Sequence, residues 1–130
     1  MRIVDRKTFL SLPPGTIFLK YPAQPDDKSY YDLAPDGEVQ IKWDTVAGVD
    51  FVCQNLIPFP EGWSDDRDVT QDHIAMLSGK EGKAADYNCA ARDGLFDDDQ
   101  LFLVWGAVDH QKLIDLLQLA LSTQKAKAAD

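Results

Sequence analysis

Cysteine and long apolar runs are scarce in this sequence, and each scarcity excludes a class of protein. The 130 residues include two cysteines and two histidines. Cys53 and Cys89 form no paired motif, which argues against a disulfide scaffold and favours buried thiols in a reducing compartment. No run approaches the roughly 18 apolar residues of a membrane span, and the first residues lack the apolar stretch of a signal peptide. We therefore expect a cytoplasmic protein with no membrane partner.

Basic residues are also in short supply. Thirteen lysines and arginines face 22 aspartates and glutamates, which gives a net charge of −9. Because contacts to phosphate dominate the affinity for nucleic acid, direct nucleic-acid binding is the class that we expect least. The acidic excess is concentrated in segments 61–72 and 93–99, and clustered like charges steer oppositely charged partners. The segments favour a basic protein surface as partner, with solvated connecting loops as the alternative.

The chain has the composition of one globular domain. Hydrophobic residues make up 45% and charged residues 27%, and a chain of this length buries roughly two-thirds of its unfolded surface. We expect a single α+β domain over residues 1–122. The Lys- and Ala-rich end has nothing to bury, so 123–130 is predicted to be a frayed tail.

Alternating and β-branched residues predict a mainly antiparallel sheet of five to six strands. The clearest strand is 38–44, in which Val39, Ile41 and Trp43 share an inward face. Glu38, Gln40, Lys42 and Asp44 share the other face, which we expect to face water. The other strand patterns lie at the N-terminus and at 16–21, 30–33, 50–57, 86–92 and 101–105. The last of these is apolar on both faces and is predicted to be central in the sheet.

Two short helices and one long helix are expected. Asp5 is a good cap for a helix that Pro13-Pro14-Gly15 ends, and Thr70 and Gly79 bracket a helix near 70–79. The last helix begins after Asp109 and is amphipathic, so we expect it to pack on one face of the sheet. Its apolar face is formed by Leu113, Leu116, Leu117, Ala120 and Leu121, widened by Ile114 and Leu119.

Motifs for catalysis are weak, and no catalytic residue, metal ligand or cofactor is expected. Segment 79–83 lacks the spacing and the hydroxyl of a phosphate-binding loop. Cys53, His73, Cys89 and His110 lack the short spacing of a zinc site, and a thiol nucleophile is disfavoured because Cys89 falls in a strand pattern. Oxygen ligands from Asp93, Asp97, Asp98 and Asp99 leave one alternative, an enzyme that uses a divalent metal at 93–99.

A binding surface is the remaining route to function. Trp63 stands in an irregular acidic loop, where a large amphipathic ring beside carboxylates is typical of an interface anchor. Packing of Trp63 over the edge of the core is the alternative. The residues that we predict to meet a basic partner are Trp63, Asp65, Asp66 and Asp68, together with Asp97, Asp98 and Asp99.

Residues 9–18, the strand 101–104 and the Leu-rich closing helix resemble small accessory proteins of bacteriophages and prophages. The resemblance covers about the first twenty and the last thirty residues, and it brings no site residues. It implies a factor directed at host proteins, and some acidic proteins of this kind imitate the charge of nucleic acid. We therefore expect a non-enzymatic acidic protein-interaction module, such as a host-directed inhibitor or charge mimic. Its oligomeric state, including self-association through a sheet edge, stays open.

Overall fold

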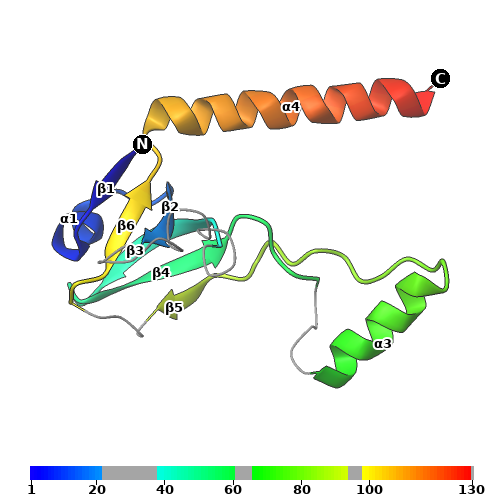
Figure 1. Ribbon diagram of the computed structural model, residues 1–130, viewed down its shortest axis with the longest axis horizontal. Helices are drawn as coiled ribbons and strands as arrows, with labels where there is room; N and C mark the ends of the chain where they lie inside the picture. The colour runs from blue at the N-terminus through cyan, green and yellow to red at the C-terminus, as the bar shows by residue number, and fades with distance from the viewer. Residues whose placement is uncertain (22–37, 61–65, 94–97, 130) are drawn as a thin grey trace, which may run out of the picture.

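The computed structural model describes residues 1–21, 38–60, 66–93 and 98–129. Its centre is a six-stranded sheet in the order β1-β6-β2-β3-β4-β5, in which every neighbouring pair is antiparallel (Figure 1). The predicted α+β class with a mainly antiparallel sheet is confirmed. The strands are β1 (Arg2–Val4), β2 (Thr16–Tyr21), β3 (Gln40–Val46), β4 (Asp50–Asn55), β5 (Ala91–Asp93) and β6 (Leu101–Val104).

Most strand predictions are confirmed, but the strand predicted at 86–92 is wrong for residues 86–90, because β5 begins only at Ala91. The strand at 16–21 has the predicted bounds, and β3 pairs with β4 across a tight turn in which Val46 lies opposite Asp50. The strand β6 lies between β1 and β2, so it is an interior strand as predicted, although it is next to the edge strand β1. The predicted strand at 30–33 falls outside the described residues.

The described helices are α1 (Arg6–Ser11), α3 (Asp66–Leu77) and α4 (Ala107–Ala129). Asp5 caps α1 as predicted, because its carboxylate accepts a hydrogen bond from the Thr8 amide at 2.8 Å. Helix α3 begins at Asp66, so Thr70 lies inside the helix and is not its cap. Gly79 follows the helix with a φ of 91°, and this left-handed conformation favours glycine after a helix end.

The core is a cluster of four phenylalanines. Phe9 of α1 stacks on Phe102 at 3.9 Å between ring centroids, and it meets Phe18 and Phe51 edge-on at 4.7 and 5.0 Å. Phe51 and Phe102 lie 6.0 Å apart, although three strand spacings, about 14 Å in a flat sheet, separate β4 from β6. The sheet therefore curls around Phe9, and α1 fills its concave face.

Lys42 reverses the predicted faces of β3. Its side chain is buried, with 1% exposed, whereas Ile41 and Trp43 are half-buried. The ammonium donates hydrogen bonds to the carbonyl oxygens of Leu12 and Trp43, at 2.9 and 3.2 Å. Carbonyl groups at a helix C-terminus attract a cation, so the end of α1 draws Lys42 inward. The expectation that Lys42 faces water is wrong.

Helix α4 does not pack on the sheet as predicted. Figure 1 shows it leaving the end of β6 and running clear of the sheet along its length. Leu116, Leu117 and Leu119 are 60%, 53% and 62% exposed. The physical reason is that α1, through Phe9, already fills the concave face of the sheet. The helix also continues through 123–129, where the sequence predicted a frayed tail.

Candidate protein-binding surface

Among the described residues, helix α4 carries more exposed large apolar side chains than any other helix or strand. Leu113, Leu116, Leu117 and Ala120 recur at the spacing of one helix face, and we call these four residues the α4 stripe. Leu113 is half-buried near the sheet, and the other three are exposed. Leu119 and Leu121 flank the stripe and are 62% and 51% exposed. Contiguous exposed apolar side chains are typical of interaction sites.

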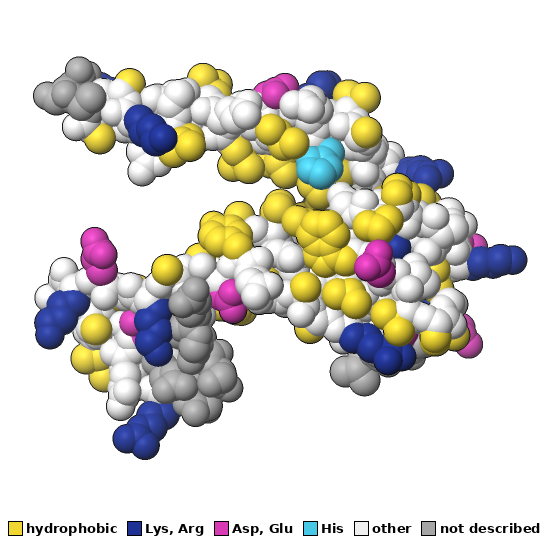
Figure 2. Space-filling model, turned by 180° about the vertical axis from the view of Figure 1, so that it is seen from behind, with side chains coloured by type: hydrophobic (Ala, Val, Ile, Leu, Met, Phe, Trp, Pro, Cys, Tyr) yellow, Lys and Arg dark blue, Asp and Glu magenta, His cyan; other side chains and the backbone are white. Residues whose placement is uncertain are grey.

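The space-filling view shows the surroundings of this surface. In Figure 2, hydrophobic side chains gather on the side of α4 that faces the rest of the protein, and open space separates them from it. The surface is therefore accessible to another chain along most of the helix. Helix α3 also projects from the sheet in Figure 1 and exposes Ile74 and Leu77, which are 60% and 75% exposed. These residues of α3 cover a shorter length of helix than the α4 stripe.

Within the described residues, contacts at its first turn hold helix α4 at the end of the sheet. The Met1 ammonium contacts Asp109 Oδ2 at 3.0 Å. The His110 amide donates to the carbonyl oxygen of Gly106 at 3.0 Å. The hydrogen bond from the Met1 ammonium lowers the pKa of the Asp109 carboxyl. These contacts fix where the helix begins and leave the leucines beyond them uncovered.

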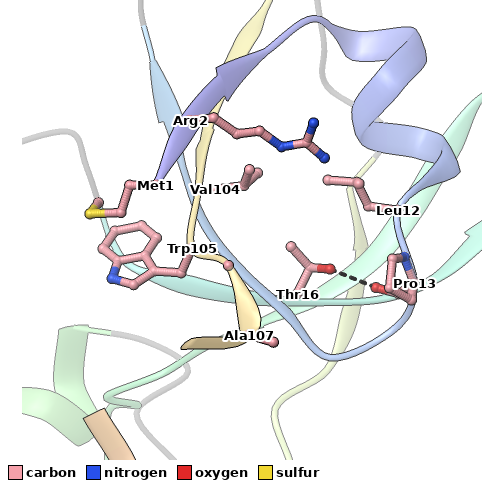
Figure 3. Close-up of a pocket in the computed structure, with 9 residues that line it drawn as sticks. Met1, Arg2, Leu12, Pro13, Thr16, Val104, Trp105 and Ala107 are labelled. Atoms are coloured by element: carbon pink, nitrogen blue, oxygen red, sulfur yellow. Dashed lines mark hydrogen bonds between the residues drawn. The ribbon is translucent and has the colours of Figure 1, made fainter. Parts of the chain in front are cut away.

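A pocket of about 280 Å³ lies where α4 leaves the sheet. Figure 3 shows the Trp105 indole and the Met1 side chain on one side of it and Leu12 and Pro13 on the other, with Val104 pointing in from β6. The wall near Pro13 is fixed, because the Thr16 hydroxyl donates to the Pro13 carbonyl oxygen at 2.8 Å. The pocket adjoins the end of β6 at Val104 and the start of α4 at Ala107.

The predicted site residues are described only in part. Trp63, Asp65 and Asp97 lie outside the described residues, and the side chains of Asp66 and Asp68 in α3 are not described either. Asp98 and Asp99 form an exposed turn before β6. Asp98 stays exposed even though it contacts the Arg6 guanidinium at 3.5 Å. The prediction of a binding site at these residues is therefore not tested.

The two acidic segments do not form one continuous face in the described part of the chain. Figure 1 places α3, which follows Trp63, at the opposite side of the molecule from the start of β6, which follows Asp99. Two of the carboxylates also have partners within the fold. Asp72 is buried and accepts from the Lys83 amide at 3.2 Å, and Asp93 pairs with Lys20 at 2.6 Å. The described parts of the two segments are therefore separated in the fold.

The described residues considered for metal and thiol chemistry do not form a metal-binding group. No group of three or more metal-ligating side chains occurs within 1–21, 38–60, 66–93 and 98–129. Burial, with a smaller contribution from the charge of Asp93, raises the pKa of the Cys53 thiol to about 11. A buried thiol with a raised pKa is a poor nucleophile at neutral pH. Its surroundings fit the predicted packing role.

The α4 surface was missed because an apolar helix face normally predicts packing against the same chain. One feature of the sequence indicated that α4 needs more than the sheet as a neighbour. Ile114, Leu119 and Leu121 widen the apolar arc beyond half of the helix circumference, which is more than one sheet face covers. Such a helix needs neighbours on more than one side.

Comparisons with known proteins identify no relative from which a site could be transferred. No protein-family model, no curated protein and no solved structure matches the chain. None of the helices in the described ranges combines the length and the hydropathy of a membrane span. The functional conclusion therefore depends on the geometry of this chain.

Proposed function

We propose that this chain is a non-enzymatic protein-interaction module that contacts its partner through the α4 stripe. One observation carries the proposal: a 23-residue helix exposes Leu116, Leu117, Leu119 and Leu121 by 51–62% each. Burial of apolar surface contributes about 25 cal/mol per Å². A partner that covers these leucines therefore gains binding free energy that the isolated chain forgoes.

The chemistry of α4 fits a protein better than a lipid surface or a small molecule. Interfacial membrane helices carry many lysines and arginines on their polar face. Helix α4 has three lysines and no arginine in 23 residues, and its other polar positions include Gln111, Asp115, Gln118 and Ser122. The net charge of −9 also opposes approach to anionic lipid. The pocket beside Trp105 holds about 280 Å³, slightly less than sites that enclose a drug-sized ligand.

The predicted contact between Trp63 and a basic partner stays a separate prediction. It concerns the residues that the sequence predicts to meet a basic partner, Trp63, Asp65, Asp66 and Asp68, together with Asp97, Asp98 and Asp99. The phage-type resemblance would make a host protein the partner, and it too stays a prediction.

Site-specific photocrosslinking in the cells that express the protein tests the proposal. A photoreactive amino acid replaces Leu117 in the stripe, or Gln118 on the opposite side of the helix as the matched control. We expect a protein adduct at position 117 and at least tenfold less at position 118, because only the stripe faces the partner. Equal yields at both positions, or no adduct at position 117, would overturn the proposal.

A further inference from the structure

We infer that the partner of the α4 stripe is the same helix in a second copy of this chain, packed antiparallel to the first. The inference rests on the proposed function and names its partner. Antiparallel pairing of two identical helices is a two-fold arrangement, in which the same patch of both copies forms the interface. The patch must therefore be complementary to itself in shape and in charge.

The charges at the two ends of the stripe meet this requirement. Asp109 and Lys127 are eighteen residues apart, which is about five turns at 3.6 residues per turn. They therefore lie on the same side of α4, one at each end of the leucines. Asp109 contacts the Met1 ammonium through Oδ2 and remains 38% exposed, and Lys127 is exposed. An antiparallel pair centred at the level of residue 118, midway between the two charges, brings Asp109 of each copy to Lys127 of the other. A parallel pair brings like charges together.

The apolar residues fit the same alignment. When the two helices are centred at the level of residue 118 along their axes, Leu116 of one copy faces Ala120 of the other. A large side chain then meets a small one, as close packing between helices requires. Leu119 and Leu121 widen the apolar surface of α4 beyond the width that one partner helix can cover. Because the antiparallel partner carries its own sheet beside the far end of α4, that sheet can cover the remaining arc near the helix tip.

The net charge of the chain does not oppose this pairing at the helix itself. Residues 107–129 contain two aspartates and three lysines, so the acidic excess lies in the sheet and its loops. The helix is about 35 Å long at 1.5 Å per residue. An interface of this length lies near the lower end of stable interfaces, which bury about 1,200 Å² in total, so we expect a dissociation constant on the order of micromolar.

Sedimentation equilibrium of the full chain across a concentration series tests the pairing. We expect the apparent mass to rise from 14.5 kDa toward twice that value. Leu117→Asp should weaken the dimer at least about thirtyfold, because it puts a charge into both halves of the interface. Gln118→Asp adds the same charge away from the stripe and should leave the mass curve unchanged. Circular dichroism confirms that each variant keeps its helices.

Charge reversal decides the direction of pairing. Lys127→Glu and Asp109→Lys should each weaken the dimer roughly tenfold, because each places like charges opposite one another twice. The double variant should restore it, since Lys at 109 then meets Glu at 127. Lys125→Glu makes the same change off the stripe and is the matched control. Parallel helices would predict no loss for Lys127→Glu and no rescue in the double variant.

The outcomes separate this inference from the proposed function. A chain that stays monomeric at millimolar concentration, or a dimer that Leu117→Asp leaves intact, overturns the second copy as partner. The proposed function survives a monomeric result if crosslinking at position 117 captures a different protein. The mass of that adduct then differs from twice the mass of the chain. The proposed function fails with no adduct at that position. A dimer without rescue by the double variant overturns the antiparallel arrangement.

Discussion

The Lys20 ammonium lies 2.6 Å from Asp93 Oδ2 and joins strands that are not neighbours in the sheet. Three strand spacings separate β2 from β5, about 14 Å in a flat sheet. The pair closes this distance because the sheet curls and because the lysine side chain is long. Asp93 was weighed as a metal ligand, and the fold instead uses its carboxylate to hold two distant strands together.

The pair between Lys20 and Asp93 should couple in a double-mutant cycle. We expect Lys20→Met and Asp93→Asn to show a coupling of about 1 kcal/mol, because Asp93 is 13% exposed and Lys20 is 37% exposed. Urea unfolding of the four variants measures it, and added salt should reduce it. Lys80→Met combined with Asp93→Asn should be additive, since Lys80 is exposed. Additivity in the Lys20 cycle as well would contradict a stabilising pair.

The buried ammonium of Lys42 should be needed for stability. Lys42→Met keeps most of the packing but leaves the Leu12 and Trp43 carbonyl oxygens without their donor, so we expect a loss of about 1–3 kcal/mol in the free energy of unfolding. Urea denaturation measures the loss. Lys83→Met, at an exposed lysine, is the control and should change stability by less than about 0.5 kcal/mol.

The stability difference between the wild type and Lys42→Met should also depend on pH. Burial lowers the pKa of Lys42 from 10.5. The unfolded chain therefore binds more protons than the folded chain between the lowered pKa and 10.5, and stability due to Lys42 rises with pH across that window. A difference that falls with rising pH would show that the ammonium is better stabilised in the fold than in water.

Alkaline pH should weaken the fold through Cys53. Its pKa is raised from 9.0 to about 11, so the folded state favours the neutral thiol. The stability due to this preference is complete below pH 9 and is lost as pH rises through about 11. We expect the wild type to lose on the order of 2 kcal/mol relative to Cys53→Ala across this range. Parallel pH profiles for the two proteins would refute the burial of this thiol.

A substitution in the turn between β3 and β4 should raise the stability of the fold. Ala47 has a φ of 52° and Gly48 a φ of 74°, and the Val49 amide donates to the Val46 carbonyl oxygen at 3.1 Å. Positive φ at both central positions is the requirement of a type I′ turn, where Asn-Gly is the favoured pair. Ala47→Asn should raise the free energy of unfolding by about 0.5–1 kcal/mol in a thermal melt. Ala47→Val should lower it, and the opposite order would contradict the turn type.

Divalent cations should leave the stability unchanged if the segment at 93–99 is not a metal site. The Asp93 carboxylate is engaged with Lys20, and Asp98 and Asp99 are exposed in a turn. A ligand that binds only the folded state raises the melting temperature. We expect no shift on titration with Ca²⁺ or Mg²⁺, and a shift that Asp98→Asn removes would revive the metal-dependent alternative.

Local chemistry was sufficient to predict most elements from the sequence. The β-branched run of β2, the capping carboxylate of Asp5 and the glycine after α3 act within a few residues, so their consequences do not depend on distant parts of the chain. The start of α3 was predicted four residues late because a capping side chain also occurs inside helices. Lys42 was misplaced because the carbonyl groups that draw it inward belong to α1, 30 residues earlier.

The candidate site depended more than the helices and strands did on contacts between segments that are distant in the sequence. The sequence by itself determined that α4 is a helix with leucines on one side, because that pattern arises from helical periodicity alone. Only the tertiary structure decided what those leucines cover. Phe9 fills the concave face of the curled sheet, and the contacts at Asp109 and Gly106 direct α4 away from it. Periodicity specifies a face, but the identity of its neighbour depends on which other segment has already occupied the available surface.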